Sequence, residues 1–266
     1  MDVSRYNELG AFVKEKLNLR TSPIAVKFCE TSEEIPEEAV LPYRDLGKHA
    51  AFCQAKAMAR MRGMTVAMGK EDHWCWNPIV GFGVCPADVG EPAGDKIVEF
   101  LGIQDKEKAE EFWTNFPRLE VGKYPYVVVA PIEKCSYEPD IILVYSNTQQ
   151  VVWEIGAVRY MTGEYIDSSF DSIDSCIHAI VEPFKSRKYK VTFPDPGDRA
   201  RANAREDEVI MSIPSERWEE FCTGIEKTEF MYNNYLNELG IETDNEVPPF
   251  YHELFQIWGL EEKPQK

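Results

Sequence analysis

The chain has 266 residues, of which 44% are hydrophobic and 28% charged, as is typical of a globular domain. Its 29 Lys and Arg against 46 Asp and Glu give a formal net charge of −17. A surface this acidic repels phosphate backbones and anionic lipids, which argues against nucleic acid or a membrane as the main partner. No apolar run approaches the ~18–20 residues that span a bilayer.

Seven cysteines, an odd number, indicate reduced thiols rather than a disulfide framework. The N-terminus lacks the continuous apolar core of a signal peptide. We therefore expect a cytoplasmic protein.

Hydrophobic periodicity and turn residues predict the secondary structure. In chain order, the predicted elements are a helix within 1–19, a strand at 22–28, a helix at 49–62, a strand at 64–69, two helices within 95–116, strands at 126–132 and 140–146, a helix at 148–161, a strand at 164–169, a helix at 172–184, a strand at 189–193, a polar loop at 194–208, a strand at 209–214, a helix from 215 to about 239 and a short helix near 250–258. Residues 71–86, rich in Trp, Cys and Gly, fit no element.

This alternation predicts an α/β fold, with α+β as the alternative, in which helices flank a mixed sheet. The order strand, helix, glycine, strand, cysteine occurs twice, through Gly63 to Cys75 and through Gly163 to Cys176. The repetition suggests two βαβ-like units in one pseudo-symmetric body. We expect one domain over residues 1–240, followed by a C-terminal tail over 241–266 that holds the last short helix.

Several segments occur in the order typical of a known family. They are TSPIAVKF, FCQAKAMAR, EDHWC, GKYPYVVVAPIEKCSYEPDIILVYSN, SSFDSIDSC and PGDR. Over about Leu17 to Thr228 the chain resembles the bacterial and archaeal family called domain of unknown function 169. The resemblance implies occurrence in anaerobes and archaea and family cysteines at Cys53, Cys75 and Cys176, but no established activity. The chain departs from the usual pattern in its polar loop, which reads PDPGDR and REDE.

The three family cysteines suggest a metal centre. Cys53 lies in the first turn of a predicted helix and Cys176 begins another, where the helix dipole favours a thiolate, while Cys75 lies in the Trp-rich loop. Three thiolates could hold a 4Fe-4S cluster and leave one iron open as a Lewis acid. Cys85 is a candidate fourth ligand. Zinc bound by three sulfurs and His73 is one alternative, and simple burial of small side chains is another.

Other residues could complete such a site. Trp74 and Trp76 could form the walls of a pocket for a flat cofactor such as haem, or anchor a packed loop. Arg199 could clamp an anionic substrate by bidentate hydrogen bonds, or pair with acids in a solvated loop. His73 and Asp198 are candidates for proton transfer. The sequence contains no GxGxxG, GxxxxGK[ST], GxSxG or HExxH motif.

We therefore predict a 4Fe-4S protein that acts on a small anionic molecule in a lyase- or desulfidase-like reaction. The alternative is a non-catalytic accessory protein that binds a metal, haem or another tetrapyrrole for a partner enzyme. In a third interpretation the cysteines are core residues and the acidic surface docks a basic partner. A homo-oligomer is compatible with each of them.

Overall fold

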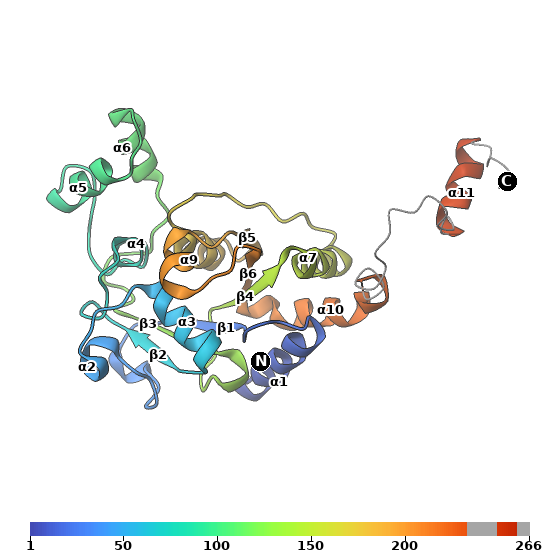
Figure 1. Ribbon diagram of the computed structural model, residues 1–266, viewed down its shortest axis with the longest axis horizontal. Helices are drawn as coiled ribbons and strands as arrows, with labels where there is room; N and C mark the ends of the chain where they lie inside the picture. Colours follow the sequence, from blue (N-terminus) through green and yellow to red (C-terminus); the bar gives the residue numbers. More distant parts are fainter. Residues whose placement is uncertain (233–248, 260–266) are drawn as a thin grey trace. The chain divides into compact units, whose positions relative to one another are not determined.

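A computed structural model describes residues 1–232 and 249–259 of the chain (Figure 1). The chain divides into two compact units, Met1–Glu229 and Phe230–Lys266. In the second unit the helix α11 (Pro249–Trp258) forms where the sequence predicts a short helix. The expected domain boundary at residue 240, and the predicted helical stretch after residue 232, lie outside the described residues.

The first unit is built on a six-stranded sheet in the order β2–β3–β1–β4–β6–β5 (Figure 1). The strands are β1 (Ile24–Cys29), β2 (Val66–Met68), β3 (Tyr126–Pro131), β4 (Ile141–Asn147), β5 (Lys190–Thr192) and β6 (Glu208–Pro214). Every neighbouring pair is antiparallel. Nearly all residues of β4 and β6 are buried, so the centre of the sheet is covered on both faces.

The α/β class is confirmed, but the sheet is antiparallel rather than mixed, and the predicted repeat is not confirmed. The strand expected at 164–169 does not form. In its place, the Ser168 hydroxyl accepts a hydrogen bond from the Val191 N–H of β5. In each half of the sheet the third strand lies between the first two: β3 separates β1 from β2, and β6 separates β4 from β5. The two expected βαβ units therefore have no directly paired parallel strands.

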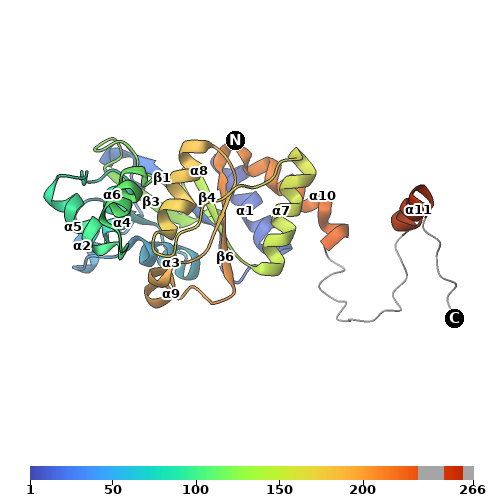
Figure 2. The same ribbon diagram turned by 90° about the horizontal axis from the view of Figure 1, so that it is seen from above.

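Helices cover both faces of the sheet. The helices of this unit are α1 (Val3–Lys16), α2 (Pro42–Leu46), α3 (Phe52–Arg62), α4 (Trp76–Gly81), α5 (Pro92–Phe100), α6 (Lys106–Asn115), α7 (Thr148–Thr162), α8 (Glu182–Ser186), α9 (Pro196–Ala202) and most of α10 (Trp218–Tyr232). A π-helical turn, Ile177–Val181, leads directly into α8. In Figure 2, β4 and β6 lie between α8 and α9 on one side and α1, α7 and α10 on the other. No helix of the described ranges is long and apolar enough to cross a membrane.

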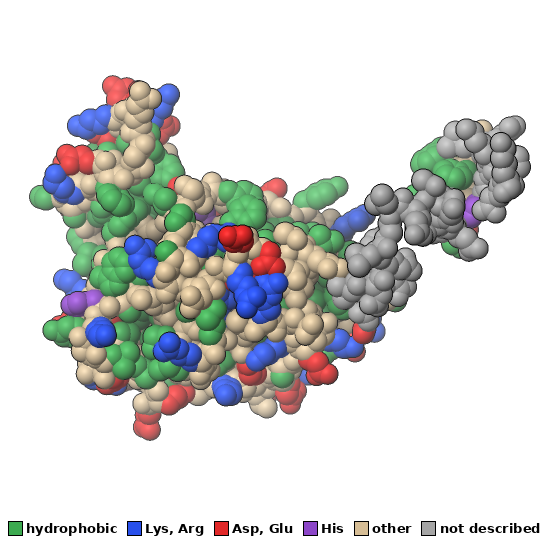
Figure 3. Space-filling model, viewed as in Figure 1, with side chains coloured by type: hydrophobic (Ala, Val, Ile, Leu, Met, Phe, Trp, Pro, Cys, Tyr) green, Lys and Arg blue, Asp and Glu red, His purple; other side chains and the backbone are tan. Residues whose placement is uncertain are grey.

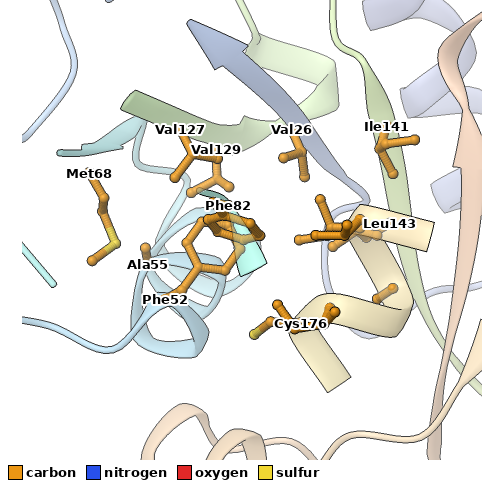
Figure 4. Packing of buried hydrophobic residues seen from close by; sticks show 14 of the residues in the cluster. Val26, Phe52, Ala55, Met68, Phe82, Val127, Val129, Ile141, Leu143 and Cys176 are labelled. Carbon is orange, nitrogen blue, oxygen red and sulfur yellow. The ribbon is translucent and has the colours of Figure 1, made fainter. Parts of the chain in front are cut away.

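One large hydrophobic cluster packs the sheet against α3, α4 and the π-helical turn. Phe52 of α3 makes an edge-to-face contact with Phe82, with ring centroids 5.0 Å apart. Figure 4 shows these two rings between the helices and the sheet residues Val26 and Val129. Cys176 belongs to the same cluster, and its sulfur is directed toward α3. The core therefore fixes the start of α3 against the segment that carries Cys176.

The predicted polar loop at 194–208 contains a helix, α9. The Asp195 side chain caps it by accepting a hydrogen bond from the Asp198 N–H at 2.9 Å, and Pro196 occupies its first turn. Proline and glycine indicate a loop in the sequence, but here proline begins a helix. The helix packs against α3, beside which it lies in Figures 1 and 2.

Candidate functional site

Three of the seven cysteines line one pocket of about 380 Å³. Cys53 lies in the first turn of α3, Cys75 caps the start of α4, and Cys176 directly precedes the π-helical turn. Trp74 and Trp76 also line this pocket, so the structure brings together all five predicted cofactor-binding residues.

Hydrogen bonds hold the Cys75 segment, the Cys176 segment and α9 together. Asn77 of α4 donates to the Ile173 carbonyl at 2.5 Å, which ties the Cys75 segment to the Cys176 segment. Asp195 accepts a hydrogen bond from the Ser175 N–H at 3.1 Å, which ties α9 to the same segment.

Burial of the three thiols favours their protonated form. Burial raises the pKa of Cys53 to about 12 and also raises the pKa of Cys75 and Cys176. A metal binds the thiolate, so metal binding here would release protons. Lys56 opposes the effect of burial at Cys176, where its charge lowers the pKa more than any single carboxylate raises it, but at Cys53 the nearby Asp198 carboxylate raises the pKa more than Lys56 lowers it.

The donor set suits a soft metal centre, because thiolates select iron–sulfur clusters, zinc and copper. In the described part of the chain, however, no three His, Cys, Asp or Glu side chains lie together around a single point where they could hold an ion. The cysteines share the pocket wall without already surrounding one position. Cys85, the candidate fourth ligand, is not among the lining residues.

A buried ionic network lies beside the pocket. Lys56 is fully buried, and its Nζ lies 3.1 Å from the Asp198 carboxylate. The same carboxylate accepts hydrogen bonds from Ser175 at 2.5 Å and from Tyr145 at 3.3 Å. Burial alone would lower the pKa of Lys56, but Asp198 raises it well above its usual value. Lys56 is therefore a fixed positive charge near the cysteines.

The three predicted catalytic residues lie outside the pocket wall. Asp198 is held in the ion pair with Lys56, and His73 is buried next to Trp74 but is not itself among the lining residues. Arg199 donates to the carbonyls of Pro194 and Arg205, at 3.2 and 2.6 Å, and so holds a turn. The arginine that lines the pocket is Arg201, whose guanidinium lies over the Trp74 ring, 4.9 Å from its centroid.

A model of the family of uncharacterised ArCR proteins, domain of unknown function 169 (DUF169), matches residues 13–224. The chain belongs to this family. It is also similar to an uncharacterised protein of Methanocaldococcus jannaschii, with 25% identity over 228 residues, 85% of this chain and 96% of that protein. No solved structure matches it significantly.

Sequence reasoning missed two buried basic residues of α3 in this DUF169 protein. Lys56 and Arg60 of α3 are both buried, and Arg60 pairs with Glu208 at 3.0 Å. A signal for them was present: they lie four residues apart, on the helical face that also holds Cys53. Two basic residues beside a buried cysteine imply acidic partners from elsewhere in the chain. The sequence does not reveal which acids these are.

His73 of this DUF169 protein is expected to make the fold sensitive to acid. It is 6% exposed, neither ring nitrogen has a hydrogen-bond partner among the described residues, and burial lowers its pKa from 6.5 to about 4. Between these pH values His73 is protonated in the unfolded chain but stays neutral in the folded chain, so stability falls as pH falls. The loss is at most about 1.4 kcal/mol per pH unit.

Urea unfolding of His73→Leu between pH 7 and 4.5 measures this effect, and the variant should lose less stability than the parent protein. His49→Gln changes an exposed histidine and is the control. Equal losses in His73→Leu and the parent would contradict this role for His73.

Proposed function

We propose that this protein binds a 4Fe-4S cluster through Cys53, Cys75 and Cys176 and acts on a small anionic molecule beside it. The observation that supports the proposal is that three cysteines far apart in the sequence line one pocket. When bound, a cluster with three cysteine ligands supplies an open iron that acts as a Lewis acid. A lyase- or desulfidase-like reaction uses this chemistry.

The residues of the chain have distinct roles in this proposal. Lys56 favours the thiolate form of Cys176. Arg201 replaces Arg199 as the anion clamp, because its guanidinium lines the pocket over Trp74. Phe52, Trp76 and other apolar residues of the wall exclude water and strengthen the attraction of Arg201 for an anion.

Anaerobic purification with absorption spectroscopy and iron and acid-labile sulfide assays tests the proposal. We expect a brown protein with a broad band near ~400 nm and about four irons per chain. Each of the variants Cys53→Ser, Cys75→Ser and Cys176→Ser should lose most of this iron, because each removes one ligand. Cys135→Ser changes a buried cysteine outside the pocket and should keep full loading, with circular dichroism as the check on folding.

Other results would change or exclude the proposal. Full iron loading in Cys53→Ser or Cys176→Ser would exclude the three-cysteine cluster. Loss of iron in Cys85→Ser would show that the cluster has a fourth cysteine ligand. A sharp Soret band would indicate haem or another tetrapyrrole between Trp74 and Trp76. Zinc in place of iron would support the site with His73. A colourless, metal-free protein would leave the cysteines as packing residues.

A further inference from the structure

A second cavity, of about 550 Å³, lies at the C-terminal end of α3 and shares no lining residue with the cysteine pocket. Six cationic side chains line it but only two carboxylates, Glu133 and Glu208. The cations are Lys14, Arg20, Arg60, Arg62, Lys134 and Arg205. The cavity wall is therefore positively charged, although the chain as a whole has a net charge of −17. Figure 3 shows blue Lys and Arg side chains gathered near the middle of the face that carries α3 and α9.

Three of these cations are already neutralised. Lys14 pairs with Glu133 at 2.8 Å, Arg60 with Glu208 at 3.0 Å, and Arg20 with Asp207 at 2.7 Å. Lys14 and Ser22 hold the pKa of Glu133 below its usual value, although burial opposes them, so Glu133 stays ionised. The two carboxylates in the wall are thus paired with cations of the same wall.

The other three cations, Arg62, Lys134 and Arg205, form no ion pair with any acid in the described ranges. Their side chains belong to exposed residues on three different segments. Lys134 Nζ lies beside Gly63, which ends α3 in a left-handed conformation (φ 70°). Gly63 therefore brings the end of α3 close to the segment that follows β3.

The C-terminal carbonyls of α3 do not bind the side chains of these three cations. The last carbonyls of α3 accept hydrogen bonds from backbone N–H groups: Met58 from Met64, Ala59 from Gly63, and Arg60 from Ser22. Arg62, Lys134 and Arg205 therefore remain available for a negatively charged ligand.

We propose that this cavity binds a small phosphate-bearing molecule. Arginine forks match phosphate oxygens, and three unpaired cations balance a group with two or more negative charges. The volume is that of a small-molecule site, and Met61 and Pro131 provide apolar contacts for an organic part of the ligand. The acidic remainder of the protein repels an extended polyanion, so the ligand is small.

Isothermal titration calorimetry with inorganic pyrophosphate, at constant ionic strength, tests the proposal. We expect saturable binding that weakens at least tenfold in Arg62→Gln/Lys134→Gln. The matched control, Arg159→Gln/Lys70→Gln, removes the same charges from exposed positions outside the cavity and should bind as the parent does. Arg201→Gln, in the cysteine pocket, should also leave binding unchanged.

Four results would overturn the proposal. They are the absence of saturable pyrophosphate binding, equal weakening in the two double variants, citrate binding as tightly as pyrophosphate, and loss of binding in Arg201→Gln. The last result would assign the anion to the cysteine pocket instead. None of these readouts depends on a cluster, so this site and the proposed function can fail separately.

Discussion

Replacing Lys56 by methionine is expected to lower the free energy of unfolding by about 3–5 kcal/mol. Lys56 is fully buried, and its partner Asp198 is 1% exposed. Without the ammonium group, the Asp198 carboxylate would keep only its hydrogen bonds to Ser175 and Tyr145 in a water-free environment. A buried charge without its counter-ion is among the most destabilising changes a core can undergo. Urea unfolding monitored by tryptophan fluorescence measures the loss.

Two comparisons test the stated cause. Arg5→Met breaks the exposed pairs with Glu219 and Glu8, at 3.2 and 3.4 Å, and should change stability far less than Lys56→Met does. Lys56→Met/Asp198→Asn removes both charges. The amide at position 198 can still accept hydrogen bonds from Ser175 and Tyr145, so the double variant should recover a large part of the lost stability. If the double variant is no more stable than Lys56→Met, the loss comes from packing around the lysine stem and not from the orphaned carboxylate.

The second large effect is expected from Glu154→Gln, a nearly isosteric change in α7 that should increase stability at pH 8. Glu154 is fully buried, and one of its oxygens accepts a hydrogen bond from Ser146 at 2.5 Å while the other has no partner among the described residues. Burial raises its pKa from 4.5 to about 8. The folded chain therefore keeps a proton that the unfolded chain loses, and each pH unit between these values costs up to about 1.4 kcal/mol.

The sign of this dependence gives a clear test. Stability from this group is greatest below pH 4.5 and falls as pH rises to about 8, so the gain of Glu154→Gln over the parent should grow across that range to several kcal/mol. Urea unfolding at a series of pH values measures it. Glu120→Gln, which removes an exposed carboxylate, is the control. A constant difference between Glu154→Gln and the parent at every pH would contradict the prediction.

Much of the candidate site follows from the sequence, but its charged residues do not. Cys53, Cys75, Cys176, Trp74 and Trp76 all line the pocket. The pocket wall contains Arg201 and not the predicted Arg199, because α9 turns the two arginines in different directions and Arg199 binds carbonyls of its own segment. Sequence distance along a polar loop carries no information about which side of an unexpected helix a residue occupies.

The sequence by itself determined the elements whose cause is local. Continuous apolar runs place β1, β3 and β4, and helical spacing places α3 and α7, within a few residues of their observed bounds, because propensity, capping and periodicity act between near neighbours. Only the tertiary structure decided the strand order, the absence of a strand at 164–169, and the pairing of Lys56 with Asp198. These three features depend on contacts between segments far apart in the chain. The free energy that stabilises such contacts comes from the burial of side chains against one another, which local sequence patterns do not predict.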